Sequence, residues 1–391
     1  MKFYKSSKAR AFPGAPIALV LSCLIAGPAP ASADIVWQNV PLNKDTFDVS
    51  QASSASFEQR GGRKALCIDG EAFLRGVSLA NGSVAVDIAN DHHRHFINVI
   101  FRAASQENYE TAYLRMHKSG HFDAVQYTPH LNGETNWRLF REAQARADFG
   151  GQPWITLRVD FSDDRAQVRV GSENDDPVLE TVLTLPAEAG GIGLRSLFKG
   201  CFSNFRYMSQ GPTWIASDAA PINHPPAGTI TRWSLSEAFP IEKWAGISAR
   251  LPRSPDWSIV EAEPNGRLLI SRYRRKAMSG GFERNRLDGV YAGVAIHSAE
   301  AQSAALQIDA SDMATVWLNG TLLLAFDNSF RAKGPLHRGD FDATKQTLGL
   351  PLRAGRNELV VLVAERANGW GLAGAVLADE AVGIGPLEID Q

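Results

Sequence analysis

The sequence predicts an all-β protein with two β-sandwich (jelly-roll) domains behind a cleaved signal peptide. Short segments throughout the chain alternate apolar and polar residues with a period of two, as strands with one buried face do. Turn pairs such as Asn-Gly and Ser-Gly separate these segments, and no long stretch has the 3.6-residue period of an amphipathic helix. Many short strands with regular turns are typical of sandwiches.

The first sandwich is expected over residues 34–208. Its clearest strand is "HFINVIFR", which places Ile97, Val99 and Phe101 on one face and Asn98 and Arg102 on the other. The segments "SVAVDI", "WITLRVDF" and "AQVRV" alternate in the same way. Apolar residues on one side of each strand predict a single core between two sheets.

Residues 209–228 predict a linker, because "SQGPTWIASDAAPINHPPAG" is rich in Pro, Ala and Ser and has no periodicity. Strand patterns resume beyond it in "GVYAGVAIHS", "AALQIDA" and "NELVVLVAER". Asn319-Gly320 lies between two apolar runs and predicts a two-residue hairpin turn. The second sandwich is therefore expected over residues 229–391.

Residues 1–33 have the pattern of a secretory signal peptide. Four basic residues precede an apolar run over 17–26, and Ala31-Ser32-Ala33 forms a small-residue cleavage site. A lipoprotein anchored at Cys23 is the alternative, although "VLSC" matches a lipobox poorly. The apolar run is too short to span a bilayer, and no other segment approaches that length. We expect an extracytoplasmic protein, periplasmic or secreted, with no membrane span.

Charge and cysteine content exclude several classes of partner and chemistry. The 40 Lys and Arg nearly balance the 42 Asp and Glu, which indicates no nucleic-acid partner. Cys67 and Cys201 remain after cleavage, and an oxidising compartment allows one disulfide between them, with two buried thiols as the alternative. Zinc, Walker A and GxSxG motifs are absent, so no cofactor is expected.

Residues 55–208 resemble the concanavalin A-like lectin/glucanase sandwich. The resemblance lies in "FRAASQENYETAYLRMHKSGHFDAVQYTPHLNGETNW", followed by "WITLRVDF", "AQVRV", "GGIGL" and "CFSNFRY". More narrowly, it is similar to laminin-G-like and 3-keto-disaccharide hydrolase-type domains. This superfamily contains lectins, glycosidases, lyases and adhesion modules, so it implies a saccharide ligand and not a reaction.

Residues 229–380 resemble the galactose-binding-like jelly roll that accompanies some glycosidase catalytic domains. "VWLNG" and "LPLRAGRNELVVLVAE" carry this resemblance. Such domains often only pack against a neighbour. Both resemblances imply a poly- or oligosaccharide partner.

Glu110 is the candidate catalytic residue. In the 3-keto-disaccharide hydrolase-type pattern an arginine strand and a "YE" strand line the site, which matches Arg102 and Glu110 here. A buried Arg102–Glu110 pair that only fixes strand register is the alternative. The family pattern also has an acidic residue five positions after the glutamate, where this chain has Arg115, and Asp123 is its one candidate replacement. Glycoside cleavage needs a second carboxyl group, so hydrolysis is in doubt.

Amide, aromatic and charged side chains next to Glu110 suit a sugar platform, because amides bind hydroxyls and aromatic faces stack on sugar rings. Tyr127 and Trp137 could equally cap the sandwich edge. The predicted substrate-binding residues are Arg102, Tyr113, Asp123, Gln126, Tyr127, Asn132 and Trp137.

Other candidates have a structural alternative. The histidines of "NDHHRH" are more typical of a polar turn than of a metal site. Calcium would need oxygen ligands, for which the sequence offers only Asp87, Asp91 and Asp123 without a loop signature. In the second domain, a site formed by Trp317, Glu365 and Trp370 competes with a core position for Trp370.

Two functions remain at this point. The first is an exported carbohydrate-binding protein that recognises saccharides on a concave sheet. The second is an exported glycoside hydrolase of the 3-keto-disaccharide hydrolase type that acts through Glu110. The missing second carboxylate favours the first.

Overall fold

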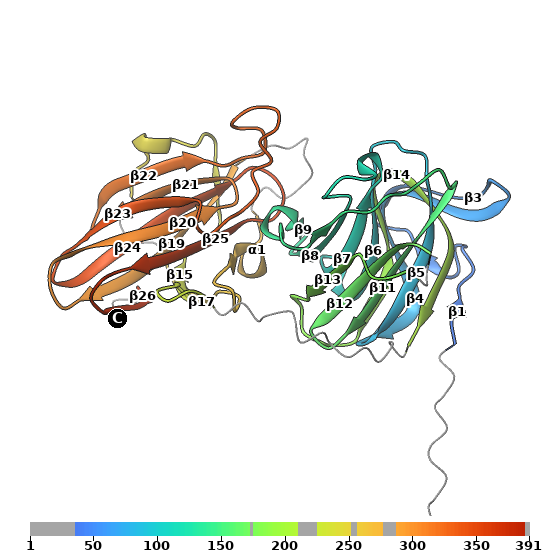
Figure 1. Cartoon of the computed structure of the whole chain (residues 1–391), viewed down its shortest axis with the longest axis horizontal. Coiled ribbons are helices and arrows are strands. Elements are labelled where there is room, and N and C mark those ends of the chain that lie inside the picture. The colour runs from blue at the N-terminus through green and yellow to red at the C-terminus, as the bar shows by residue number, and fades with distance from the viewer. Residues whose placement is uncertain (1–35, 173–174, 210–224, 252–255, 277–286, 388–391) are drawn as a thin grey trace, which may run out of the picture. The chain divides into compact units, whose positions relative to one another are not determined.

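The computed structural model describes residues 36–172, 175–209, 225–251, 256–276 and 287–387. The predicted signal peptide and most of the predicted linker lie outside this range. The described chain is almost entirely β-strand, which confirms the predicted fold class (Figure 1). None of its few short helices has the length and apolar character that crossing a bilayer requires.

The first fourteen strands form one hydrogen-bonded network. They are β1 (Gln38–Asn39), β2 (Phe47–Asp48), β3 (Ala52–Arg60), β4 (Arg63–Leu79), β5 (Gly82–Ala89), β6 (Phe96–Ser105), β7 (Asn108–Arg115), β8 (Val125–Leu131), β9 (Glu134–Thr135), β10 (Gln144–Ala145), β11 (Trp154–Ser162), β12 (Arg165–Gly171), β13 (Leu179–Val182) and β14 (Gly190–Met208). Two 3₁₀ turns accompany them, η1 (Met116–Lys118) and η2 (Trp137–Leu139).

Strand β14 joins the two sheets of this network. The strand order is β10-β8-β7-β6-β14-β5-β11-β12-β13, and β14 also pairs with β4. Its first half pairs with β6 and its second half with β5, and its pairing with β4 shifts register between Ser196 and Gly200, where it passes from one sheet to the other. Gly193 lies at another register shift, where a Cβ would come within 2.4 Å of the Ala72 carbonyl oxygen. Close backbone approach at a bulge requires glycine here.

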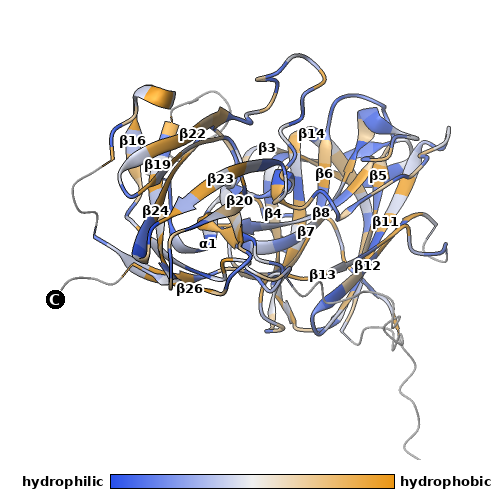
Figure 2. Cartoon of the chain, turned by 60° about the vertical axis from the view of Figure 1, so that its left-hand side comes forward, coloured by the Kyte–Doolittle hydropathy of each residue, from blue (hydrophilic) through white to orange (hydrophobic). Residues whose placement is uncertain are grey.

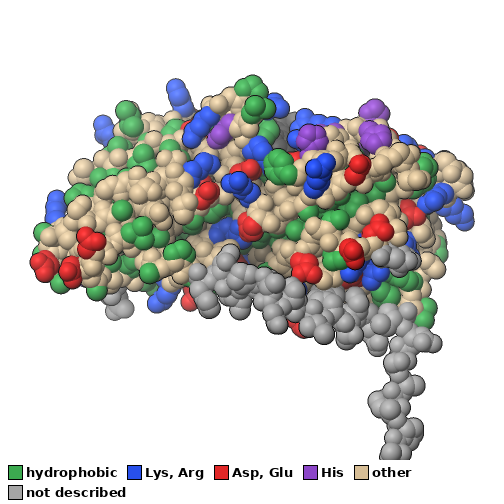
Figure 3. Space-filling model, viewed as in Figure 1, with side chains coloured by type: hydrophobic (Ala, Val, Ile, Leu, Met, Phe, Trp, Pro, Cys, Tyr) green, Lys and Arg blue, Asp and Glu red, His purple; other side chains and the backbone are tan. Residues whose placement is uncertain are grey.

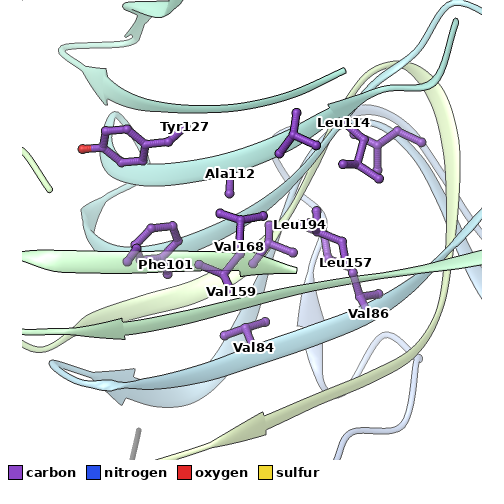
Figure 4. Packing of buried hydrophobic residues seen from close by; sticks show 14 of the residues in the cluster. Val84, Val86, Phe101, Ala112, Leu114, Tyr127, Leu157, Val159, Val168 and Leu194 are labelled. Atoms are coloured by element: carbon purple, nitrogen blue, oxygen red, sulfur yellow. The ribbon is translucent and has the colours of Figure 1, made fainter. Parts of the chain in front are cut away.

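The core of the first sandwich lies between these two sheets. Phe101 of β6 stacks on Phe161 of β11, with ring centroids 4.9 Å apart. The apolar faces predicted by alternation point inward, and Figure 4 shows Val84, Val159 and Ala112 packed together. Figure 2 shows hydrophobic and hydrophilic segments along the same strands, as one buried face requires.

Strands β15 onward form two further sheets. They are β15 (Arg232–Leu235), β16 (Phe239–Ile241), β17 (Ser258–Glu261), β18 (Leu268–Leu269), β19 (Leu287–Ser298), β20 (Gln302–Ala310), β21 (Met313–Leu318), β22 (Thr321–Asp327), β23 (Gln346–Leu352), β24 (Gly355–Glu365), β25 (Gly371–Leu377) and β26 (Val382–Pro386). The short helices η3 (Gly246–Ser248) and α1 (Ile270–Tyr273) belong to the same part of the chain.

The second sandwich has an eight-stranded sheet of order β17-β15-β19-β24-β21-β22, with β16 and β26 on β19, and a four-stranded sheet of order β18-β25-β20-β23. Its core contains Trp233 and Trp370, both fully buried. The predicted hairpin turn at Asn319-Gly320 joins β21 to β22, and both residues have positive φ, at 50° and 77°. These angles are those of the type I′ turn that Asn-Gly favours.

The predicted disulfide between Cys67 and Cys201 is present. The two cysteines are direct cross-strand partners on β4 and β14, with Cα atoms 4.0 Å apart. They pack with Ala65 and Ala89 in a small cluster of their own. The bridge therefore ties the first long strand of this sandwich to its last.

Contacts between the two sandwiches centre on Arg138, which is 2% exposed. Its guanidinium forms salt bridges to Asp312 and to Glu365, the second at 2.5 Å. It also donates to the Ser311 carbonyl oxygen at 3.0 Å. A buried cation with two buried carboxylates is a costly arrangement unless all three stay together, so this cluster holds η2 against the β20–β21 turn and the end of β24.

Candidate functional site

Six polar side chains form a row across one sheet, on the face opposite the core. Each is the direct cross-strand partner of the next, so the row follows the strand order β4-β14-β6-β7-β8-β10. Apolar core residues precede or follow most of them in sequence, as alternation requires. We call this the polar row, and its members are Glu71, Arg195, Asn98, Tyr113, Gln126 and Gln144.

Hydrogen bonds run along the polar row. Arg195 Nε lies 3.2 Å from Glu71 Oε1, and the Tyr113 hydroxyl donates to Gln126 Oε1 at 2.8 Å. Asn98 Nδ2 donates to the backbone carbonyl oxygen of Arg195 at 3.3 Å. The Glu71 and Arg195 side chains are 17% and 19% exposed, whereas Gln126 is fully buried. The row is therefore open to solvent on the β4–β14 side and closed at β8.

A second polar group lies beside the open end of the row. The Tyr109 hydroxyl donates to Glu71 Oε1 at 2.7 Å, and its ring stacks on His130 with centroids 4.5 Å apart. Burial lowers the pKa of His130 well below its usual value, with a further contribution from Arg195, so this imidazole is neutral. Within the described chain, His130 Nδ1 is buried and has no hydrogen-bond partner.

Exposed aromatic rings border the row at two places. On one side Phe198, 44% exposed, lies 6.4 Å from Phe96, which lies 6.4 Å from Tyr113 of the row. On the other side the Arg115 guanidinium lies 4.9 Å from the Tyr113 ring and 5.8 Å from the Trp137 ring. Aromatic rings therefore lie on both sides of Tyr113, and the Arg115 guanidinium lies between two of them on one side.

The second sandwich contributes to this border. Phe330, which is 43% exposed, meets Trp137 edge-on with ring centroids 6.3 Å apart. Arg338 from the same loop binds Asp123 at 2.6 Å and lies over the Phe122 ring at 5.2 Å. The aromatic border therefore consists of Phe96, Phe198, Trp137 and Phe330.

Four of the residues predicted from the sequence come together here. Tyr113 and Gln126 belong to the polar row, Trp137 to the aromatic border, and Asp123 to the salt bridge beside it. Glu71, Arg195 and His130 were not among the residues predicted from the sequence. Arg195 and Glu71 lie 124 positions apart, and only the pairing of β14 with β4 brings them together.

The structure contradicts the catalytic role expected for Glu110. Its side chain lies on the core face of β7 and is fully buried. Glu110 accepts hydrogen bonds from the Tyr127 hydroxyl at 2.8 Å and from the backbone N–H groups of Thr184 and Leu185 at 2.9 and 2.7 Å. Burial raises the pKa of Glu110, and these donors oppose that shift. In this position the carboxylate fastens the 184–185 segment to the sandwich.

Three predicted substrate-binding residues also lie elsewhere. Arg102 donates to the Ala80 carbonyl oxygen at 2.7 Å and is 2% exposed. A register shift after Phe101 and a φ of 48° at Arg102 break the alternation that predicted its direction. Tyr127 is a core residue (Figure 4), and Asn132 donates to the Ser271 carbonyl oxygen at 2.8 Å.

The aspartates considered as calcium ligands are each paired with an arginine instead. Asp87 binds Arg63 at 2.7 Å, and Asp123 binds Arg338. The carboxylate of Asp91, in the loop before β6, lies 3.6 Å from the Arg60 guanidinium and 3.2 Å from His95 Nε2. These pairings place the three carboxylates in separate salt bridges.

The residues considered as a site in the second domain have structural roles. Trp370 belongs to the core, and Trp317 is 3% exposed. Glu365 is fully buried and bound to Arg138 and to the Ser311 hydroxyl. Burial raises the pKa of Glu365 well above its usual value, although Arg138 opposes the shift.

Comparison with known proteins gives weak similarities to solved structures, each over less than half of the chain. No protein-family model matches, and no curated protein matches significantly. Among solved structures, the carbohydrate-binding module CBM66 from Bacillus subtilis is 16% identical, with a TM-score of 0.32, over 45% of this chain and 98% of the module. A Bacillus subtilis protein of unknown function with a galectin-like fold is 11% identical, with a TM-score of 0.30, over 45% and 89%.

A xylan β-1,4-xylosidase from Bacillus halodurans is 13% identical, with a TM-score of 0.32. The similarity covers 46% of this chain but only 40% of the xylosidase. At these identities and TM-scores none of these proteins identifies a family for this chain.

Proposed function

We propose that this protein binds an oligo- or polysaccharide on the polar row and the aromatic border, outside the cytoplasm, without cleaving it. The observation that carries the proposal is the row itself, which crosses six strands on the face away from the core. Sugars present many hydroxyl groups and apolar C–H faces at once. A site for them combines hydrogen-bonding side chains with aromatic rings.

The open part of the row supplies the hydrogen bonds. Glu71 accepts from sugar hydroxyls, and Arg195 donates to sugar oxygens. Their salt bridge fixes both side chains before a ligand arrives, which lowers the entropy lost on binding. Phe198 and Phe330, both more than two-fifths exposed, offer ring faces at the two sides.

Binding is favoured over hydrolysis by the position of the carboxylates. Glu110 lies in the core. On the face that carries the polar row, which we call the ligand face, Glu71 is paired with Arg195 and Asp123 with Arg338. Paired carboxylates of this kind orient neighbouring groups, whereas glycoside cleavage uses one carboxyl group that carries a proton and another that attacks or activates water.

The test is a glycan-array screen, followed by calorimetry on the best ligand with Phe198→Ala and Trp137→Ala. Loss of one stacking ring should weaken binding by about tenfold, equivalent to about 1.4 kcal/mol. Ile259→Ala is the matched control, because Ile259 is 51% exposed on β17 and belongs to neither the row nor the border. Unchanged affinity in both folded ring variants, or release of sugar products by the wild-type protein, would refute the proposal.

A further inference from the structure

Arg115 lies on the same face of the sheet as the polar row, and its environment is unusual for a buried cation. This guanidinium is 5% exposed, and its three hydrogen bonds go to the Asp123 backbone carbonyl oxygen, the Tyr113 hydroxyl and Gln126 Oε1. All three acceptors are uncharged. A guanidinium has five N–H donors, so two remain for another acceptor. Buried cations are normally paired with an anion, because desolvation is otherwise uncompensated.

Other cations surround Arg115. Arg94 lies over both Phe96 and Phe198, 5.9 Å from each ring. Lys118 Nζ lies 4.0 Å from the Asp123 carboxylate, and Arg338 lies 2.6 Å from it. One carboxylate thus serves two cations, and Arg115 contacts only the backbone of that aspartate.

Asp340, which binds Arg338 at 3.2 Å, is the second carboxylate of this group. Asp69, which accepts a hydrogen bond from the Phe198 N–H at 3.1 Å, is the third. The described group therefore contains four cations, Arg94, Arg115, Lys118 and Arg338, and three carboxylates. In the face that Figure 3 shows, basic and histidine side chains lie close together along the upper edge, with hydrophobic side chains between them.

The titration of His117 is consistent with a positive potential at this place. Burial lowers the pKa of His117, and Arg94, Lys118 and Arg115 lower it further, whereas only Asp123 acts in the opposite direction. The His117 ring lies 5.5 Å from Phe96 of the aromatic border. A ligand on this border is therefore exposed to the same excess of positive charge.

We infer that the saccharide site selects acidic saccharides, and that Arg94 and Arg115, on opposite sides of Tyr113, each bind an anionic group of the ligand. The inference rests on the proposed saccharide-binding function. Arginine binds carboxylate and sulfate through parallel N–H donors, and an aromatic ring beneath the guanidinium holds it flat. A sugar stacked on Phe198 or Phe96 would bring a ring substituent next to Arg94, which already lies over both rings.

The experiment uses ligand pairs that differ only in charge. Binding of oligogalacturonate is compared by calorimetry with its carboxyl-reduced form, and dextran sulfate is compared with dextran. We expect at least about tenfold tighter binding of one anionic member over its neutral counterpart, and a loss of this preference as salt rises. The pair that shows the preference identifies carboxylate or sulfate as the anion.

The variants are Arg115→Gln and the double change Arg94→Gln with Lys118→Gln. Each should weaken binding of the anionic ligand severalfold more than binding of the neutral ligand. The double variant keeps the test valid if the buried Arg115→Gln change prevents folding. Arg356→Gln is the control, because Arg356 is an exposed arginine paired with Glu358 on β24.

Two results would overturn the inference in distinguishable ways. Equal affinity for charged and neutral members of both pairs contradicts selection by charge but leaves the saccharide site in place. Absence of binding to every saccharide tested contradicts the proposed function, and the inference fails with it.

Discussion

Glu110 and Arg115 lie five positions apart on the same strand and therefore point to opposite sides of the sheet. Glu110 reaches the core, where three hydrogen-bond donors meet it. Arg115 reaches the ligand face, where its acceptors are uncharged. The two buried charges thus differ in their partners: Glu110 has charge-compensating donors in the core, whereas the hydrogen-bond acceptors of Arg115 are uncharged.

Replacement of Glu110 should affect stability and not binding. Glu110→Ala leaves the Leu185 N–H without its acceptor and the Thr184 N–H with only the Tyr127 hydroxyl, which should lower the free energy of unfolding by about 1–3 kcal/mol. Glu110→Gln keeps one carbonyl oxygen for them and should cost about 1 kcal/mol. Chemical denaturation measures both effects. Saccharide affinity of either folded variant should equal that of the wild type. A large loss of affinity would show that Glu110 takes part in saccharide binding.

Strand alternation predicted the residues that depend only on local geometry. It placed Ile97, Val99 and Phe101 on the core face of their strand, as observed. It failed for Arg102, because a register shift and a left-handed backbone conformation reverse the direction of that side chain. The backbone N–H groups that donate to Glu110 belong to a segment that begins 74 positions later in the chain, and no local pattern reveals this contact.

At the scale of elements, the strands of both sandwiches could be predicted because each has a clear apolar face. The polar row could not, because it depends on which strands are neighbours. Glu71 and Arg195 meet only through the pairing of β4 with β14, and that pairing contains two register shifts. Bulges of this kind are set by tertiary packing and leave little trace in the sequence.

The disulfide that joins β4 and β14 should contribute measurably to stability. Cys67 and Cys201 are separated by 134 positions, and closing a loop of that length stabilises by about 4–5 kcal/mol in the chain-entropy model. We expect Cys67→Ala with Cys201→Ala to lower the free energy of unfolding by about 2–4 kcal/mol, since residual structure in the unfolded chain reduces the effect. Denaturation with and without reductant measures it. Reductant should change the wild type only, and equal curves for all samples would contradict the prediction.

At the scale of the whole molecule, the buried cluster around Arg138 links the two sandwiches. We expect a chain cut within residues 209–228 to yield fragments that stay together, because separation would expose Asp312 and Glu365 without their cation. Arg138→Ala should weaken this association by about 3–5 kcal/mol, the usual result of removing one partner from a buried ion pair. Size-exclusion chromatography of the cleaved protein measures the association.

The matched control for that experiment is Arg275→Ala. Arg275 also links the two sandwiches, through a salt bridge to Glu107, but both side chains are 48% exposed. Exposed pairs of this kind contribute about 0–1 kcal/mol, so the fragments of this variant should stay together. Separation of the cleaved wild-type protein would show that the Arg138 cluster does not hold the sandwiches together.

The position of β14 also determines when the first sandwich can fold. Strand β4 joins the strand sets β6-β7-β8-β10 and β5-β11-β12-β13 only through residues 190–208, and its pairing partners there lie more than 100 positions later in the chain. Contacts between residues so distant in sequence form slowly, because a long loop must close before any pairing energy is gained. The first sandwich should therefore complete its fold only after β14 has been synthesised, late in the synthesis of this part of the chain.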